Sequence, residues 1–363
     1  MSESKRRFDF GKMMKSQLAL PIIALLVMLV VNVIIIAVTK QANFFKVSIN
    51  NGVLYGYIID ILNRSSELVI LAVGMTLVAA SSRGTDISVG AVAAISGALI
   101  VRLLGSSYDS YAMVPVLAIF FGLLASAACG AFNGLLVARL NIQPMIATLI
   151  LFTAGRGIAQ LISSTETATG VILYVRKEPF RYIGGFIPGC IVPTPIFIAI
   201  IFVALTYLVL KKTAMSTYIQ TVGINPKAGR LVGINSALVI FFCYVFCGLS
   251  SGVAGMIASS RIYSSDANNI GLNMEMDAIL AVALGGNSLS GGKFNLMGSV
   301  IGAVTIQALN TCLYAIGVSG DQLPVYKAAV VILIVLFQSP TFKAWLTNMK
   351  NSRASKKLEG GAV

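Results

Sequence analysis

Long runs of apolar residues recur from one end of this chain to the other, and they limit its possible folds more than any other feature. Each run approaches the roughly 17 to 25 residues that an α-helix needs to cross a bilayer. Hydrophobic residues make up 57% of the chain and charged residues only 11%, a balance outside that of soluble globular proteins. The sequence therefore predicts an all-α integral membrane protein in which residues 1–363 form a single transmembrane domain.

Counting each apolar run once gives about ten expected spans, some of them short or broken. The second, Glu67–Ser82, is short, and the eighth, Met274–Gly285, is too short to cross as a straight helix at about 1.5 Å per residue. The first run is too long for a signal peptide and is kept as a span. The expected spans are Leu18–Val38, Glu67–Ser82, Ile87–Leu104, Ala112–Ala138, Pro144–Ser163, Pro195–Leu210, Ser236–Ala258, Met274–Gly285, Leu296–Ile316 and Pro324–Gln338.

Spans two to five and spans seven to ten share a plan, in which an apolar helix is followed by a glycine- and serine-rich break and then by further helices. The first break is SSRGTDISVG (Ser81–Gly90), and the second is GGNSLSGGK (Gly285–Lys293). Five spans separate the two sets, so they would enter the membrane in opposite directions, as inverted repeats of transporters do. Such breaks are costly in lipid but tolerable against protein or a wet cavity.

The formal charge of +14 is explained by the placement of the basic residues, without a nucleic-acid partner. With ten spans and an internal N-terminus, the larger share of Lys and Arg falls on the cytoplasmic side. That share includes the N-terminal residues 1–17, the stretch 211–235 and a basic tail at 343–363. The positive-inside rule therefore places both termini in the cytoplasm.

One stretch, Thr221–Asn235, stands out as polar, positively charged and rich in glycine in a mostly apolar chain. We call it the polar segment. Its sequence, TVGINPKAGRLVGIN, lies on the expected cytoplasmic side between the two possible repeats. Composition alone supports only a solvated loop whose charges set the orientation of the chain.

No pattern of residues supports catalysis. The chain has no histidine, which removes the commonest metal ligand and the usual general base. GGNSLSGGK does not match a phosphate-binding loop, because Asn287 stands where the first glycine is required and Phe294 follows the lysine. Glu275 and Asp277 are two residues apart, so on a helix they point to different faces. We therefore expect neither an enzyme nor a metal site.

Four stretches of the sequence together resemble a known family, the membrane permease subunits of bacterial ABC importers for simple sugars of the ribose and galactose type. They cover most of the chain in the family's order. The resemblance is carried by Leu71–Leu99, by Gly130–Leu149 with the GRG at Gly155–Gly157, by Thr221–Ala258 and by Met274–Ala303.

The resemblance implies a ten-span permease in the bacterial cytoplasmic membrane that works by alternating access. Its partners would be ABC ATPase subunits, which use ATP and magnesium, a second permease subunit and an extracytoplasmic sugar-binding protein, while this chain would bind no cofactor itself. It also implies that residues 211–235 couple the permease to the ATPase. The residues implied for coupling are Gly223, Asn225, Ala228, Arg230 and Gly233.

A translocation route for a neutral, hydroxylated sugar should offer hydroxyl, amide and backbone groups. The polar residues expected on that route could equally serve helix–helix hydrogen bonds. They are Asp86, Ser88, Asn133, Glu275, Asn287, Gln307 and Asn310. The acidic members could instead pair with Arg83, with Arg156 or with backbone N–H groups. The family's usual turn, Gly-Gly-Ile-Asp-Leu-Ser, appears here as Arg83–Ser88, with an added charge and a threonine.

Two other classes of transporter remain open. An ion-coupled secondary transporter would explain the spans without an ATPase. An ABC permease for nucleosides or branched-chain amino acids would explain the polar segment, and in the amino-acid case it should hold a site for a zwitterion. The sequence leaves open which sugar is carried and whether the permease pairs with a copy of itself or with a different chain.

Overall fold

The computed structural model describes residues 18–38, 45–50, 52–107, 110–164, 172–175 and 177–338. The expected cytoplasmic N-terminus (1–17) and basic tail (343–363) lie outside the described residues. The chain divides into two compact units, Met1–Ala308 and Leu309–Val363. The second unit holds the end of α13 (Leu296–Ala315) and α14 (Leu323–Gln338).

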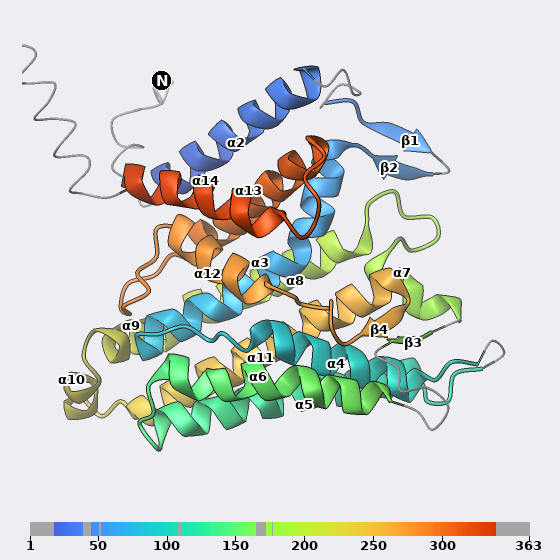
Figure 1. Cartoon of the computed structure of the whole chain (residues 1–363). Coiled ribbons are helices and arrows are strands. Elements are labelled where there is room, and N and C mark those ends of the chain that lie inside the picture. The colour runs from blue at the N-terminus through green and yellow to red at the C-terminus, as the bar shows by residue number, and fades with distance from the viewer. Residues whose placement is uncertain are drawn as a thin grey trace, which may run out of the picture. The chain divides into compact units, whose positions relative to one another are not determined.

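Helices account for nearly all regular structure in the first unit (Figure 1). Two antiparallel pairs of three-residue strands, β1 with β2 and β3 with β4, complete it. Its elements, apart from α13, are α2 (Ala19–Val38), β1 (Ser48–Asn50), β2 (Val53–Tyr55), α3 (Tyr57–Ser82), α4 (Val89–Leu104), α5 (Pro115–Ala138), α6 (Pro144–Ser163), β3 (Ile172–Tyr174), the 3₁₀ turn η1 (Glu178–Phe180), α7 (Arg181–Gly184), α8 (Thr194–Lys212), α9 (Met215–Ile224), α10 (Pro226–Leu231), α11 (Ser236–Ile262), β4 (Ser264–Asp266) and α12 (Met274–Leu284).

Every one of the ten expected spans contains a helix. Within the described ranges, seven helices are long and apolar enough to cross a membrane. The apolar helices α4 and α14 have 16 described residues each, and α12 has 11, as a partial span requires. The prediction of an all-α membrane protein is confirmed.

The second span is not short, and that prediction was wrong. Helix α3 has 26 residues and begins at Tyr57, ten residues before the expected start at Glu67. Its first turns carry charges, which made them look like a loop. In the structure, Arg64 donates to Asp60 one helical turn away, with 2.9 Å between Nε and Oδ1, so both charges are compatible with a helix.

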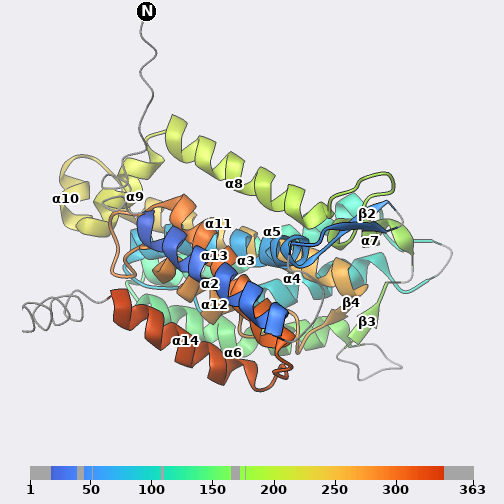
Figure 2. The ribbon, with the colours of Figure 1, turned by 90° about the horizontal axis from the view of Figure 1, so that it is seen from above.

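Helix α11 contacts α3, α4 and α5, whereas α8 lies along an edge of the first unit (Figure 2). Helix α11 is uncharged over most of its length and rich in small residues, which let neighbouring backbones approach. The backbones of Gly130 in α5 and Gly248 in α11 touch, because a Cβ added at either glycine would overlap the other helix. Gly255 lies in the same way against the backbone of Ala93 in α4.

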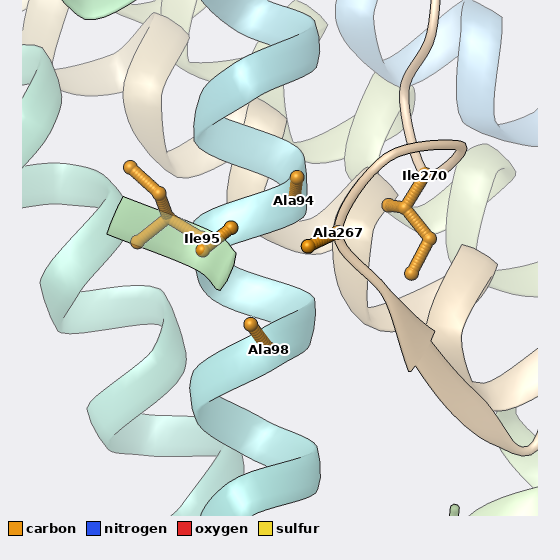
Figure 3. Packing of buried hydrophobic residues seen from close by; sticks show 6 residues of the cluster. Ala94, Ile95, Ala98, Ala267 and Ile270 are labelled. Carbon is orange, nitrogen blue, oxygen red and sulfur yellow. The ribbon is translucent and has the colours of Figure 1, made fainter. Parts of the chain in front are cut away.

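Helix α4 also packs against the segment that follows β4. Figure 3 shows Ala94 of α4 close to Ala267, with Ile270 beyond it, while Ile95 points to the other side of the helix; these residues and Ala98 are all buried. Small side chains on α4 therefore bring an irregular segment from the second half of the chain into the interior of the first unit.

Candidate functional site

Two of the non-helical segments inside the first unit lie against each other. The first follows Arg83, where α3 ends, and reaches α4, for which Ser88 is the N-cap residue. The second joins β4 to α12, which begins at Met274. Irregular backbone of this kind is tolerated at membrane depth when protein buries it, and it often lines transporter binding sites.

Asp86, Ser88 and Asn133 form one buried cluster at the first interruption. The Oδ1 atom of Asp86 accepts hydrogen bonds from the backbone N–H of Ser88, at 2.9 Å, and from its hydroxyl, at 2.6 Å. The Nδ2 atom of Asn133 in α5 donates to the hydroxyl oxygen of Ser88 at 2.9 Å. All three side chains are buried. The structure therefore brings together three residues that the sequence analysis assigned to a route.

The two interrupted segments meet at Gly90 and Gly271. A Cβ added at Gly90 would overlap the carbonyl oxygen of Gly271, and a Cβ at Gly271 would overlap the backbone of Gly90. The carboxylate of Glu275 lies against Gly90, two residues after Ser88. Glu275 is 3% exposed, and its Oε2 atom has no hydrogen-bond partner among the described residues. The meeting point thus holds a buried carboxylate oxygen that is free to accept a hydrogen bond.

Arg156 of α6 fixes the second segment in place. Its Nη1 atom donates to the carbonyl oxygens of Ala267, Asn268 and Ile270 at 3.1, 2.9 and 3.1 Å. The arginine within the span of α6 is therefore bound to the backbone of the segment between β4 and α12.

Asn287 belongs to a different cluster, between α12 and α13. Its Nδ2 atom donates to the carbonyl oxygen of Asn295, at 3.1 Å, and to the hydroxyl of Ser299, at 2.7 Å, while its Oδ1 atom accepts from the N–H of Asn295 at 2.5 Å. Ser299 also bonds to Thr76 of α3 at 2.6 Å. Both ends of the amide are occupied, so in this structure Asn287 closes the loop after α12 and joins it to α3.

Replacing Asn287 by leucine is expected to destabilise the permease by about 1 to 3 kcal/mol, because the half-buried N–H and C=O groups of Asn295 lose their partner and Ser299 keeps only Thr76. Thermal unfolding in detergent measures the change. Ser288→Ala is the matched control: this exposed neighbour should change stability by less than about 0.5 kcal/mol. Equal melting of the two variants would contradict the role given to Asn287.

The last two residues expected on the route lie on α13. Gln307 is half-buried and belongs to the first unit. Asn310 belongs to the second unit, where its side chain is buried and its Oδ1 atom has no partner among the described residues.

The polar segment folds into the end of α9, the short helix α10 and a turn. Asn225 is the N-cap of α10: its Oδ1 atom accepts from the N–H groups of Lys227 and Ala228 at 3.0 and 3.3 Å. Gly233 has a φ of 82°, in the left-handed region that favours glycine. Ala228 and Arg230 are exposed on α10. Two of the five residues implied for coupling therefore shape the segment, and two lie on its surface.

Gly223, the fifth of those residues, is buried. A Cβ there would overlap the carbonyl oxygen of Ala80 at the end of α3 and approach the N–H of Gly292. The N–H of Gly292 in turn donates to the carbonyl oxygen of Ala80 at 2.9 Å. Gly223 thus lets α9 lie directly against α3 and the loop after α12. The polar segment therefore contacts the end of α3, in the first half of the chain, and the loop after α12, in the second half.

Side chains that the sequence analysis missed complete these contacts. Arg83, noted there as an added charge and as a possible partner of the acidic residues, donates from Nε to the carbonyl oxygen of Gly223 at 2.7 Å. Thr76 and Ser299 gave no signal, because their bond joins residues 223 positions apart. In the part of the chain that the structure describes, no group of three or more His, Cys, Asp or Glu residues could hold a metal ion.

Comparison with known proteins places this chain in a family. Residues 57–338 match the family described as "Branched-chain amino acid transport system / permease component". The galactofuranose transporter permease protein YtfT of Escherichia coli K12 is 40% identical over 96% of this chain and 95% of its own length. The fructose import permease protein FruF of Bifidobacterium longum is 38% identical, over 95% and 94%. The ribose import permease protein RbsC of Escherichia coli K12 is also 38% identical, over 87% and 91%. No solved structure matches the chain. The chain therefore belongs to this family of transport-system permease components.

Proposed function

We propose that this chain is the transmembrane subunit of an ABC importer that carries a simple sugar into a bacterial cell. The observation that carries the proposal is the 38 to 40% identity, over 87 to 96% of the chain, to permeases named for galactofuranose, fructose and ribose. The chain itself is a transport subunit without a catalytic role. ATP would be hydrolysed, with magnesium, by separate ATPase subunits.

The polar segment is the site through which the ATPase would act. Within this segment, α10 exposes Arg230 and Leu231, and Leu231 has 90% of its surface exposed. The start of the segment, at the end of α9, is anchored to α3 through Gly223. Nucleotide binding would move this segment and, through α3 and the loop after α12, both interrupted regions. The segment and both chain termini would lie in the cytoplasm, in keeping with the distribution of Lys and Arg.

The route for the sugar would pass the meeting point of the interrupted segments. Gly90 and Gly271 close it by backbone contact in this conformation. Separation of the two segments would expose the free oxygen of Glu275 and the cluster of Asp86, Ser88 and Asn133, which can exchange hydrogen bonds with sugar hydroxyls. A second permease subunit would complete the route, and a binding protein outside the cell would deliver the sugar.

A second candidate function is import of a branched-chain amino acid or of a nucleoside, because the matching family is described by amino-acid transport. The sugar proposal is favoured by the names of the relatives. An ion-coupled secondary transporter remains the contrasting class, because it would need no ATPase partner.

The test is uptake by the complete transporter in proteoliposomes, with the permease, its ATPase and its binding protein reconstituted together. ATP-dependent uptake of a monosaccharide such as ribose, fructose or galactose is expected, with no competition by leucine or by a nucleoside. Uptake driven by an ion gradient without the ATPase, or leucine binding by the partner binding protein, would overturn the sugar assignment.

Reversing the charge of Arg230 tests coupling in the same assay. Arg230→Glu is expected to lower uptake about tenfold, an effect equal to about 1.4 kcal/mol, because an exposed charge on α10 that meets the ATPase would be reversed. Arg139→Glu, at an exposed arginine outside the polar segment, is the matched control. Gly223→Pro is a less direct probe, since Gly223 is buried against α3. Wild-type uptake by Arg230→Glu in a fully assembled complex would contradict coupling through α10.

A further inference from the structure

The residue at the end of α3 is an arginine in a left-handed backbone conformation. Arg83 has φ 59° and ψ 32°. This region is uncommon for residues that have a Cβ, whereas glycine enters it without steric strain. The chain therefore places a long cationic side chain where its backbone would favour glycine.

The guanidinium of Arg83 binds the C-terminal end of α9. Its Nε atom donates to the carbonyl oxygen of Gly223 at 2.7 Å, and its Nη2 atom donates to the carbonyl oxygen of Ile224. The last carbonyl groups of a helix have no partner within the helix, and the helix dipole makes that end attractive to a cation. The planar fork of an arginine can serve two adjacent acceptors, which a lysine cannot do with the same geometry.

The contact lies where three parts of the chain converge. Gly291, in the loop after α12, has a φ of 89°, and a Cβ there would meet the Cγ atom of Arg83. The next residue, Gly292, bonds to Ala80 of α3. Glycines in the loop therefore leave the space through which the Arg83 side chain reaches α9, and Figure 1 shows α9 beside the end of α3.

The backbone connects this contact directly to the first interrupted segment. Arg83 is three residues before Asp86, whose side chain caps the turn into α4, and α4 carries Gly90 of the closed meeting point. A displacement of α9 would act through the guanidinium on Arg83, three residues before Asp86.

We propose that Arg83 is a positioning residue for coupling: it ties the end of α9 to the first interrupted segment, so that movement of the polar segment is transmitted to the route. This role rests on the proposed function of the chain as an ATP-driven permease. Arg83 itself need not touch the sugar or ATP.

The tie can be tested on the purified permease without any transport. Arg83→Gly keeps a residue suited to the left-handed backbone but removes the guanidinium, and Arg83→Gln removes the charge. Hydrogen exchange of the amides at the end of α9 should become about fivefold faster or more in both variants, because the last turn loses its anchor. Arg83→Lys should lie between them and the wild type. Arg139→Gln, at an exposed arginine that also follows a helix, is the control and should leave α9 unchanged. Unchanged exchange in Arg83→Gly would overturn the tie.

Coupling is then measured in the reconstituted transporter as sugar molecules moved per ATP hydrolysed. Arg83→Gly should assemble normally and melt no lower than the wild type, yet the ratio should fall about fivefold or more while basal ATP hydrolysis persists. Partial recovery of the ratio in Arg83→Lys would support the positioning role. If Arg83→Gly kept the wild-type ratio of sugar moved to ATP hydrolysed although exchange in α9 was faster, Arg83 would have a structural role only. That result would overturn the proposal. A wild-type complex that moves no sugar would refute the proposed function instead, and the exchange experiment would still decide whether the tie exists.

Discussion

Replacing Gly248 by valine is expected to abolish the folded permease. The Cβ of any larger residue would overlap the carbonyl oxygen of Ser126 and the backbone of Gly130, and neither can move aside as a flexible side chain can. Overpacking of an interior typically costs about 1 to 3 kcal/mol, and more where rigid backbone is involved. Because α5 and α11 form the most extensive helix–helix contact of the first unit, the loss falls on its main packing contact.

The measurement is the yield of monodisperse protein and its thermal unfolding in detergent. Gly248→Ala should already melt lower than the wild type, and Gly248→Val should give little folded protein. Gly157→Val in α6 is the matched control, because nothing lies within 4 Å of a Cβ at that exposed glycine. If Gly248→Val were as stable as Gly157→Val, the close contact between α5 and α11 would be wrong.

Replacing Arg261 by methionine is expected to destabilise the permease by about 3 to 5 kcal/mol, the usual result when one partner of a buried ion pair is removed. Glu67 in α3 is 8% exposed, and its Oε1 atom lies 3.1 Å from the Nη2 atom of Arg261 in α11. The same nitrogen also donates to the carbonyl oxygen of Asn63 at 3.1 Å. Without the arginine, the buried carboxyl of Glu67 and the half-buried carbonyl of Asn63 lose their donor.

The exposed pair in α3 supplies the control for this effect. Arg64 and Asp60 are 57% and 47% exposed, so Arg64→Met should cost no more than about 1 kcal/mol. The double variant Glu67→Leu with Arg261→Met should recover much of the stability lost in Arg261→Met, because no uncompensated charge remains. Melting of Arg261→Met and Arg64→Met at the same temperature would show that the Glu67 pair contributes no more than a surface pair.

Apolar length and glycine-rich breaks were sufficient to locate most helices. In a bilayer every backbone N–H and C=O group must be satisfied within the protein, so a long apolar run has little choice but a helix. The same reasoning located the partial helix at Met274. It failed at Tyr57–Arg64, because the charges there are paired within the helix, and it placed the start of α3 at Glu67, whose partner lies 194 residues away in α11.

The residues proposed for the route were also found by type before their positions were known. Sequence reasoning named Asp86, Ser88 and Asn133, which one cluster unites, but it grouped them with Asn287, which belongs to another. The type of an amide or hydroxyl side chain does not reveal which other side chains it contacts. Only contacts between distant helices decide which of them share a cluster.

Composition and apolar length were enough to show that this chain spans a membrane, where most of its helices lie and which segment is polar. These properties depend on local composition, because each segment must be compatible with the bilayer or with water on its own. That Gly90 meets Gly271, that Glu67 pairs with Arg261 and that Arg83 reaches α9 followed only from the packing of the helices. Each of these contacts joins residues more than 100 positions apart, and it forms only when small residues allow the helices between them to pack closely.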